Sequence, residues 1–298
     1  MENLKDLKLY THKLNDSEVF IEKILRVSDK IFQSDCLVIN DHPFYSDFNA
    51  SVGFINPLYL LECARQIETY LSHKEFGIYL DSKFLLRKWS IKYYITPLED
   101  SDKIKANIFT NKKATRNEFN IIFTKDDRII SEIKINVTYV SSACYKLIRK
   151  HIQTSPQKIE LKENLNPECV CYNSPDNVIL TRLHDTVPYI STIININKNN
   201  KSFNDHEQDH ITGMNLTEAA KQLCYYYLSK MHENIGYFIP TEIDGDFFNY
   251  VEINMPAIVK IQKVSLYNDI YFFNVNVLQN ESIMASLKLK IERNIWKN

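Results

Sequence analysis

Two stretches of the chain are apolar around most of a helical circumference, and alternating stretches follow each of them. The apolar helical positions are Leu58, Leu60, Leu61, Ala64, Ile67 and Leu71 in the first stretch, and Met214, Leu216, Ala219, Ala220, Leu223 and Cys224 in the second. A helix that is hydrophobic nearly all round is buried. Apolar and polar residues alternate in segments that predict antiparallel strands with one buried face. These segments are residues 103–109, 133–137, 264–266, 272–277 and 284–291.

The same order of features occurs twice, which predicts an internal duplication. The first helix carries Glu62, and the second carries Glu218 at the matching place, an offset of 218 − 62 = 156. Gly77 matches Gly236, and Pro97 matches Pro256, both at an offset of 159 residues. A third block aligns residues 13–21 with 182–190, an offset of 182 − 13 = 169, and makes Lys13 and Arg182 equivalent cations that are candidates for binding a phosphate.

A helix with several long strands, present twice, favours an α+β double hotdog: two tandem units, each a curved antiparallel sheet around a central helix. We expect an N-terminal repeat over 1–152, a polar linker over 153–176 and a C-terminal repeat over 177–298. Residues 145–152 predict a short helix before the linker. The two repeats then form an intramolecular pseudo-dimer, and the sequence leaves a monomer and a homodimer open.

Composition narrows the classes of partner. The formal net charge is -1, which gives no electrostatic footprint for nucleic acid or an anionic membrane. The first residues lack the apolar core of a signal peptide, and no apolar run is long enough to span a membrane, so a soluble cytoplasmic protein is expected. With 5 glycines the chain has no dinucleotide fingerprint or phosphate loop, and we expect no cofactor.

Residues 206–210 read HEQDH and match the H-E-x-x-H pattern of zinc hydrolases. That pattern binds zinc only on a continuous helix, where the two imidazoles lie on one face. Thr212 and Gly213 follow at once and favour a loop with a helix beginning after it, so no metal site is expected, and a zinc hydrolase with Glu233 as third ligand is the least favoured alternative.

Asp209-His210-Ile211-Thr212-Gly213-Met214, running into Glu218-Ala219-Ala220-Lys221-Gln222, resembles the D-H-x-x-G-M…E-A-x-[RK]-Q signature of the A-factor biosynthesis hotdog family. The resemblance covers essentially the whole chain. It implies a tandem hotdog enzyme that moves a β-ketoacyl group from an acyl carrier protein thioester (or a CoA thioester) to a small hydroxyl acceptor such as dihydroxyacetone phosphate, on the way to a butyrolactone-type signal.

The resemblance also implies where the chemistry lies, near the N-terminus of the central helix. The expected catalytic residues are Glu218 as general base, within about the first helical turn, His210 sharing that role, and Glu62 as the counterpart of Glu218 in the first repeat. The expected substrate-binding residues are Asp209, Gly213, Lys221 and Arg65. Gly213 permits close backbone approach, and Thr212 or Asn215 caps the helix.

Several alternatives stay open at this point. The first repeat has Gly53 and Phe54 where the second has Asp209 and His210, so the two sites are unequal. Glu62 and Glu218 each have a cation three residues later, so both have an alternative role as helix-face ion pairs. His42 is interpreted as a turn residue before Pro43. For the whole protein, the alternatives to a transferase are a hotdog dehydratase or thioesterase, and a non-catalytic binder of acyl groups or signals.

Overall fold

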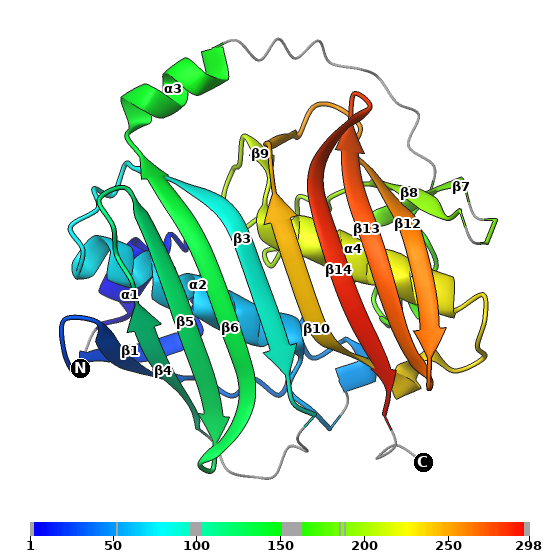
Figure 1. The fold of residues 1–298 in the computed structure, drawn as a ribbon, viewed down its shortest axis with the longest axis horizontal. Helices are drawn as coiled ribbons and strands as arrows, with labels where there is room; N and C mark the ends of the chain where they lie inside the picture. Colours follow the sequence, from blue (N-terminus) through cyan, green and yellow to red (C-terminus); the bar gives the residue numbers. More distant parts are fainter. Residues whose placement is uncertain are drawn as a thin grey trace. The chain divides into compact units, whose positions relative to one another are not determined.

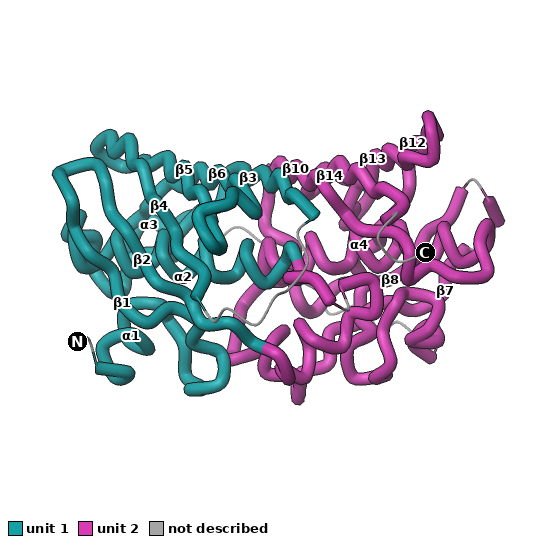
Figure 2. The backbone as a smooth tube through the Cα atoms, turned by 90° about the horizontal axis from the view of Figure 1, so that it is seen from below, with its two compact units in different colours: residues 1–39, 57–153 teal, residues 40–56, 154–298 magenta. Residues whose placement is uncertain are grey.

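A computed structural model describes residues 3–51, 53–95, 103–150, 163–184, 186–187 and 189–294. The chain divides into two compact units, shown in different colours in Figure 2. Unit 1 comprises residues 1–39 and 57–153, and unit 2 comprises residues 40–56 and 154–298. Among the described residues, no helix is long and apolar enough to cross a membrane.

Unit 1 is a curved antiparallel sheet around one helix, α2 (Figure 1). Its helices are α1 (Leu4–Thr11), α2 (Pro57–Lys74) and α3 (Ser142–Lys150). Its strands are β1 (Ile21–Arg26), β2 (Ile31–Cys36), β3 (Lys83–Tyr93), β4 (Ile104–Thr110), β5 (Arg116–Lys125) and β6 (Arg128–Val140). They are ordered β1-β2-β4-β5-β6-β3.

Unit 2 repeats this plan around α4 (Gly213–Leu228). Its main strands are β7 (Leu180–His184), β8 (Ser191–Ile194), β10 (Phe238–Phe247), β12 (Ile258–Tyr267), β13 (Ile270–Gln279) and β14 (Ser282–Arg293), ordered β10-β14-β13-β12-β8-β7. The short strands β9 (His210–Ile211) and β11 (Val251–Glu252) pair separately. Each unit is therefore a hotdog, and the predicted α+β double hotdog is confirmed.

The sequence pattern explains why these elements form. Pro57 opens α2, where its missing N–H and fixed φ suit the first helical position. In both helices nearly all side chains are buried, as the apolar circumference predicts. The strands alternate between buried and more exposed positions, most regularly in β4 and β5. The predicted strand segments fall within strands apart from Lys103, and the predicted short helix is α3, beginning a few residues earlier than expected.

Tight turns join the longest strands. Three of these turns consist of two consecutive residues with positive φ between antiparallel strands: Asp126-Asp127, Asn268-Asp269 and Asn280-Glu281. Two residues in this conformation form the type I′ turn, whose twist matches a β-hairpin and which Asn and Asp tolerate well. These short polar pairs fix the registers of β5–β6, β12–β13 and β13–β14.

The structure differs from the expected domain boundaries at two places. Residues 40–56, placed in the first repeat by sequence, lie in unit 2. The predicted linker 153–176 lies partly outside the described residues, at 153–162, and the remainder is folded: it forms a short 3-10 helix, η3 (Pro167–Val170), with Val170 and Tyr172 buried. The prolines that suggested a linker instead begin 3-10 turns at Pro167 and Pro175.

Candidate functional site

A buried polar cluster surrounds Glu218 on α4. Tyr172 donates a hydrogen bond from its hydroxyl to Glu218 Oε1 (2.9 Å), and Gln222 Nε2 donates to the same oxygen (2.9 Å). Lys221 Nζ lies 2.9 Å from Glu218 Oε2 and also donates to the Tyr172 hydroxyl (2.8 Å). The Lys221 side chain is 0% exposed, so this ion pair is closed off from bulk solvent.

Burial sets the proton affinities in this cluster. Desolvation raises the pKa of Tyr172 well above its ordinary value, and the neighbouring Glu218 charge raises it further, so the phenol stays protonated and can act only as a donor toward Glu218. Desolvation lowers the pKa of Lys221, and Glu218 opposes that shift. The result is one carboxylate held between one ammonium group and one phenol.

Aromatic rings from residues 40–56 cover this cluster. Phe44 stacks on Tyr172 with ring centroids 5.6 Å apart, and Phe48 lies 5.5 Å from the same ring. Lys221 Nζ lies 3.7 Å from the centre of the Phe48 ring, a cation–π contact that offsets part of the desolvation of the ammonium. Phe203, from the loop before α4, packs edge-on against Phe44 at 4.7 Å.

Asp47 holds that segment in place within unit 2. Its carboxylate accepts hydrogen bonds from the backbone N–H groups of Asn173 and Ser174 and from the Asn177 amide (2.8 Å). Asn177 also donates to the carbonyl of Pro43 (2.8 Å). Because Phe44 and Phe48 flank Asp47 in sequence, these bonds position both rings over Tyr172.

The counterpart in unit 1 surrounds Glu62 and contains more positive charge. Arg65 binds Glu62 in a bidentate manner, with Nε 2.8 Å from Oε2 and Nη2 2.7 Å from Oε1. Lys13 Nζ lies 3.0 Å from Oε1, and Gln66 Nε2 donates to Oε1 as well. Burial alone would raise the pKa of Glu62, but the charges of Arg65 and Lys13, with hydrogen bonds from Arg65 and Gln66, outweigh it and lower the pKa to about 2.

One glutamine in each helix ties the helix to the first strand of its unit. Gln66 accepts from the Phe20 N–H and donates to the Glu18 carbonyl, while Gln222 accepts from the Ile179 N–H and donates to the Asn177 carbonyl. These bonds make Phe20, just before β1, equivalent to Ile179, just before β7, with a sequence offset of 179 − 20 = 159. At the same offset Lys13 is equivalent to Tyr172.

The predicted equivalence of Lys13 with Arg182 is therefore wrong. Arg182 lies on β7 with an exposed side chain, whereas Lys13 is buried beside Glu62. The two alignments differ by ten residues, and a short apolar segment flanked by polar residues fits either of them almost equally well. Residues 182–190, matched by the sequence to the start of the first repeat, end just before the second strand of unit 2, β8. The 159 offset of Gly77 with Gly236 agrees with the structure, and Pro97 lies outside the described residues.

The residues around the start of α4 make different contacts. The helix begins at Gly213, and Thr212 caps it by accepting from the Asn215 N–H. Asn215 does not cap; its amide donates to the carbonyl of Phe203 (3.0 Å). Glu218 is the sixth residue of the helix and lies in the second turn, not the first, because the helix starts five residues earlier.

His210 and Asp209 pair with each other and not with Glu218. His210 Nδ1 lies 2.6 Å from Asp209 Oδ1, and its ring packs edge-on against Tyr250 at 4.7 Å. Backbone pairing of β9 with β11 places His210 opposite Glu252. Within the described ranges, no hydrogen bond joins His210 to Glu218.

The zinc pattern at residues 206–210 is not helical. His206 contacts Asp205 and Gln208, residues adjacent in the same loop, and only His210 at its end enters a short strand. The two imidazoles therefore do not share a helix face as H-E-x-x-H requires. His42 Nδ1 accepts from the backbone N–H groups of Phe44 and Tyr45, which supports its interpretation as a turn residue.

The sequence interpretation missed Tyr172 and the part that Lys13 has in unit 1. Tyr172 was assigned to a linker, and Lys13 was matched to the wrong residue. The signal that could have found both is the 159-residue offset of the glycine pair, which carries Lys13 onto Tyr172 directly.

Solved structures similar to this chain include thioesterases. The chain is similar to a putative oleoyl thioesterase of Lactobacillus plantarum, with a TM-score of 0.56 and 8% identity over 90% of this chain and 98% of that one. It is also similar to an acyl-ACP thioesterase of Bacteroides thetaiotaomicron, with a TM-score of 0.53 and 14% identity over 89% and 100% of the two chains. At such identities the likeness establishes the fold alone.

Sequence comparison is more specific. The model of the A-factor biosynthesis hotdog domain matches residues 8–141 and again residues 154–292. A characterised relative from Streptomyces virginiae, a 2-oxo-3-(phosphooxy)propyl 3-oxoalkanoate synthase, is 21% identical over 262 residues, which cover 84% of this chain and 85% of the relative. With both halves matched by the same domain, the chain belongs to the A-factor biosynthesis hotdog family.

Proposed function

We propose that the protein is an acyltransferase that moves a 3-oxoacyl group from a carrier-protein thioester to the hydroxyl of a small phosphorylated acceptor such as dihydroxyacetone phosphate. The observation that carries the proposal is the similarity to the Streptomyces virginiae synthase, whose name describes the product of that transfer, across both repeats.

The two carboxylates have unequal surroundings, which favours the second repeat as the reacting half. A carboxylate with a pKa of about 2 is a weak proton acceptor, and Glu62 is held there by two cations. Glu218 faces one cation, Lys221, and a phenol that donates to it. Glu218 is therefore the general base of the proposal, and Glu62 is a buried structural anion.

The start of α4 supplies the complementary electrophilic site. Gly213 and Met214 are partly exposed at the helix N-terminus, where backbone N–H groups point outward and carry the positive end of the helix dipole. A thioester carbonyl oxygen placed there gains negative charge during attack and is stabilised by these donors. In unit 2 the helix thus offers N–H groups at its end and a carboxylate in its second turn.

In the proposed step, Glu218 accepts the proton of the acceptor hydroxyl as its oxygen forms a bond to the thioester carbonyl carbon. The tetrahedral adduct then breaks its C–S bond, and the carrier leaves as a thiol after the proton on Glu218 returns to sulfur. Tyr172 and Gln222, both donating to Oε1, orient the carboxylate throughout.

Mass spectrometry of the carrier and of the small-molecule products tests this function. Purified protein is given a 3-oxoacyl carrier thioester with and without dihydroxyacetone phosphate, and a 3-hydroxyacyl carrier thioester in parallel. We expect deacylation only when the acceptor is present, with one ester formed per carrier released. Deacylation at the same rate without acceptor would indicate a thioesterase, loss of water from the 3-hydroxyacyl carrier would indicate a dehydratase, and binding without turnover would indicate an acyl-binding protein; each outcome contradicts the proposal.

A further inference from the structure

The end of unit 1 that carries α3 has a concentration of exposed positive charge. Lys83 is the first residue of β3 and Arg116 is the first residue of β5; both lie opposite the end of β6, at Val140 and Thr138 respectively. Helix α3 follows β6 directly. We define the basic end as Lys83, Arg87, Arg116, Lys146, Arg149 and Lys150.

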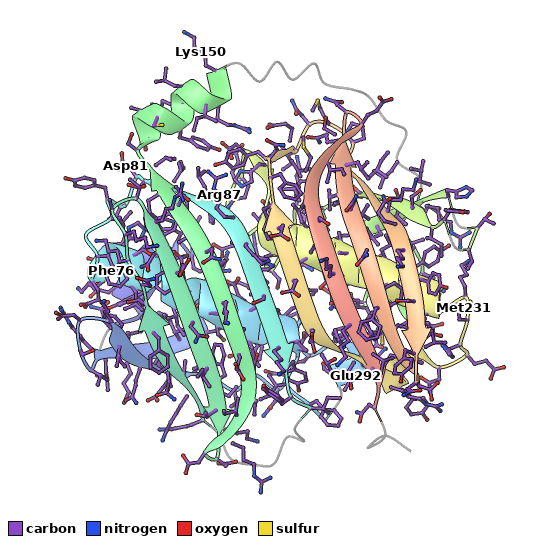
Figure 3. All side chains as sticks on the ribbon, in the orientation of Figure 1. Phe76, Asp81, Arg87, Lys150, Met231 and Glu292 are labelled. Atoms are coloured by element: carbon purple, nitrogen blue, oxygen red, sulfur yellow. The ribbon has the colours of Figure 1, made fainter. Side chains whose placement is uncertain are left out.

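Helix α3 is fixed to this end of the sheet. Tyr145 is buried, and its ring centroid lies 5.7 Å from Lys83 Nζ and 5.9 Å from the Arg149 guanidinium. The Ser142 hydroxyl donates to the carbonyl of Asp81. Cations from two elements therefore meet at one aromatic residue, and Figure 3 labels Arg87 on β3 and Lys150 on α3.

Five of these cations form no ion pair with a carboxylate in the described part of unit 1. No ion pair there involves Lys83, Arg87, Arg116, Lys146 or Lys150, and the nearby carboxylates Asp81 and Glu118 form none with them. On β10 and β14 of unit 2, by contrast, Lys290 pairs with Glu242 (3.4 Å) and with Glu292 (2.6 Å), a residue labelled in Figure 3. Five cations without an ion pair are therefore gathered at one end of unit 1, in a chain whose total charge is near zero.

Exposed apolar side chains accompany the charges. Leu147 is 66% exposed and Ile148 is 44% exposed, and both lie on α3 between Lys146 and Arg149. A surface that combines unpaired cations with exposed apolar residues fits a protein partner of opposite charge, because charge steers the encounter and apolar contact adds binding energy. The cations lie on the strands β3 and β5 as well as on α3, so the charge is not confined to one face of a helix, as it is in an amphipathic membrane helix, and the arrangement fits a protein partner better.

We infer that the basic end is the docking surface for the acidic face of an acyl carrier protein. The inference rests on the proposed function, in which a carrier protein delivers the acyl group. A partner with carboxylates along a helix and a few apolar residues beside them complements both the cations and the exposed Leu147 and Ile148.

Binding of a fluorescently labelled holo carrier protein from bacterial fatty-acid synthesis tests this inference without requiring turnover. Two charge-reversal pairs are compared with wild type: Lys146→Glu with Lys150→Glu on α3, and Arg87→Glu with Arg116→Glu on the strands. The matched control is Lys201→Glu with Lys263→Glu, two exposed lysines of unit 2. We expect each basic-end pair to weaken carrier binding by about tenfold or more at low salt and the control by less than about twofold, with the differences shrinking at high salt. Melting temperatures identify any variant that misfolds, and the other pair then carries the test.

Turnover of a carrier-free N-acetylcysteamine thioester separates docking from catalysis. We expect the basic-end variants to process this small substrate like wild type and to lose kcat/KM only with the carrier substrate. A wild type that binds carrier but transfers nothing would contradict the proposed function and leave docking intact. Binding of the same proteins to vesicles containing anionic lipid is measured in parallel by sedimentation. Equal affinities of basic-end and control variants for the carrier, no carrier binding by wild type, or a loss confined to vesicle binding would overturn the docking inference.

Discussion

At the scale of single residues, the two repeats put the same residue type to different uses. Glu62 and Glu218 occupy matching helix positions and both bind a cation three residues on, but Lys13 completes a second ion pair only in unit 1, and Tyr172 takes its place in unit 2. The difference between Lys13 and Tyr172, both in the segment before the first strand, thus gives Glu62 a second cation and gives Glu218 a neutral hydrogen-bond donor.

Replacing each carboxylate by its amide should separate these roles. Glu218→Gln should lower kcat by about 100-fold or more, because general-base catalysis contributes that much. Glu62→Gln leaves Lys13 and Arg65 without their buried counter-charge, which costs about 3–5 kcal/mol for a buried pair, somewhat less here because Arg65 is 27% exposed. Steady-state kinetics and chemical denaturation of both variants check this. If Glu62→Gln lost activity per folded molecule as severely as Glu218→Gln, the assignment of roles would be wrong.

Glu68 should make the stability of unit 1 depend on pH. Its side chain is buried on α2 and accepts from Ser72 (3.0 Å) and Thr69 (3.2 Å), and burial raises its pKa to about 7 against 4.5. A carboxyl whose pKa is raised on folding destabilises the fold once pH exceeds its unfolded value. The loss should therefore grow from pH 4.5 to 7 and reach about 3 kcal/mol above pH 7.

Denaturant unfolding of wild type and Glu68→Gln at several pH values measures this effect, since the amide cannot titrate. The stability difference between the two proteins should change in favour of the variant as pH rises from 5 to 8. A difference that stays constant over that range would show that Glu68 titrates normally.

At the scale of elements, the glutamine on each central helix does what a strand partner would otherwise do. Gln222 is 0% exposed and satisfies the N–H of Ile179 and the carbonyl of Asn177 where β7 begins. Buried backbone groups left without partners are costly, so this side chain fixes the start of the sheet to the helix.

Gln222→Met should destabilise the protein by about 2–4 kcal/mol, because two buried backbone groups lose their partners. Gln66→Met should do the same in unit 1, whereas Gln262→Met, at an exposed position of β12, should change stability by less than about 0.5 kcal/mol. Hydrogen exchange at Ile179 should accelerate in Gln222→Met and stay unchanged in the control. Unchanged protection at Ile179 would mean that the glutamine is dispensable.

Individual helices and strands were predicted from the sequence more accurately than the contacts between them. Alternation located five of the strands, and all-round hydrophobicity located both central helices, because those patterns report burial of each element by itself. The equivalence of β1 and β7 in the two repeats could not be predicted, because the short segments around them can be aligned ten residues out of place. The positions of His210 and Glu218 could not be predicted either, since β9 pairs with β11, a strand formed some forty residues later.

At the scale of the whole molecule, the division of the chain into units does not follow the duplication. Residues 40–56 belong by sequence to the first repeat but fold with unit 2, where Phe44 and Phe48 cover the Glu218 cluster. The duplication predicted two tandem hotdog units with a linker, and no local pattern indicates that a loop of one repeat packs onto the helix of the other. The anchor of that loop is Asp47, whose acceptors are filled by Asn173, Ser174 and Asn177.

Asp47→Ala should therefore impair the second repeat although it lies in the sequence of the first. Removing the carboxylate leaves the N–H groups of Asn173 and Ser174 without this acceptor and frees Phe44 and Phe48 to move off Tyr172. We expect a loss of about 1–3 kcal/mol in stability and a larger relative loss in turnover than for Asp29→Ala, an exposed aspartate in the turn after β1. Equal effects of the two substitutions would show that Asp47 does not position the aromatic cover.

The central claim is that Glu218 in the second repeat accepts the proton of an acceptor hydroxyl during acyl transfer. The most direct measurement is the single-turnover rate of 3-oxoacyl transfer from carrier protein to dihydroxyacetone phosphate, followed by intact-protein mass spectrometry for wild type, Glu218→Gln and Glu62→Gln. We expect acceptor-dependent ester formation that falls by about 100-fold or more in Glu218→Gln and persists in the folded fraction of Glu62→Gln. Transfer that survives in Glu218→Gln and is lost in folded Glu62→Gln would contradict it.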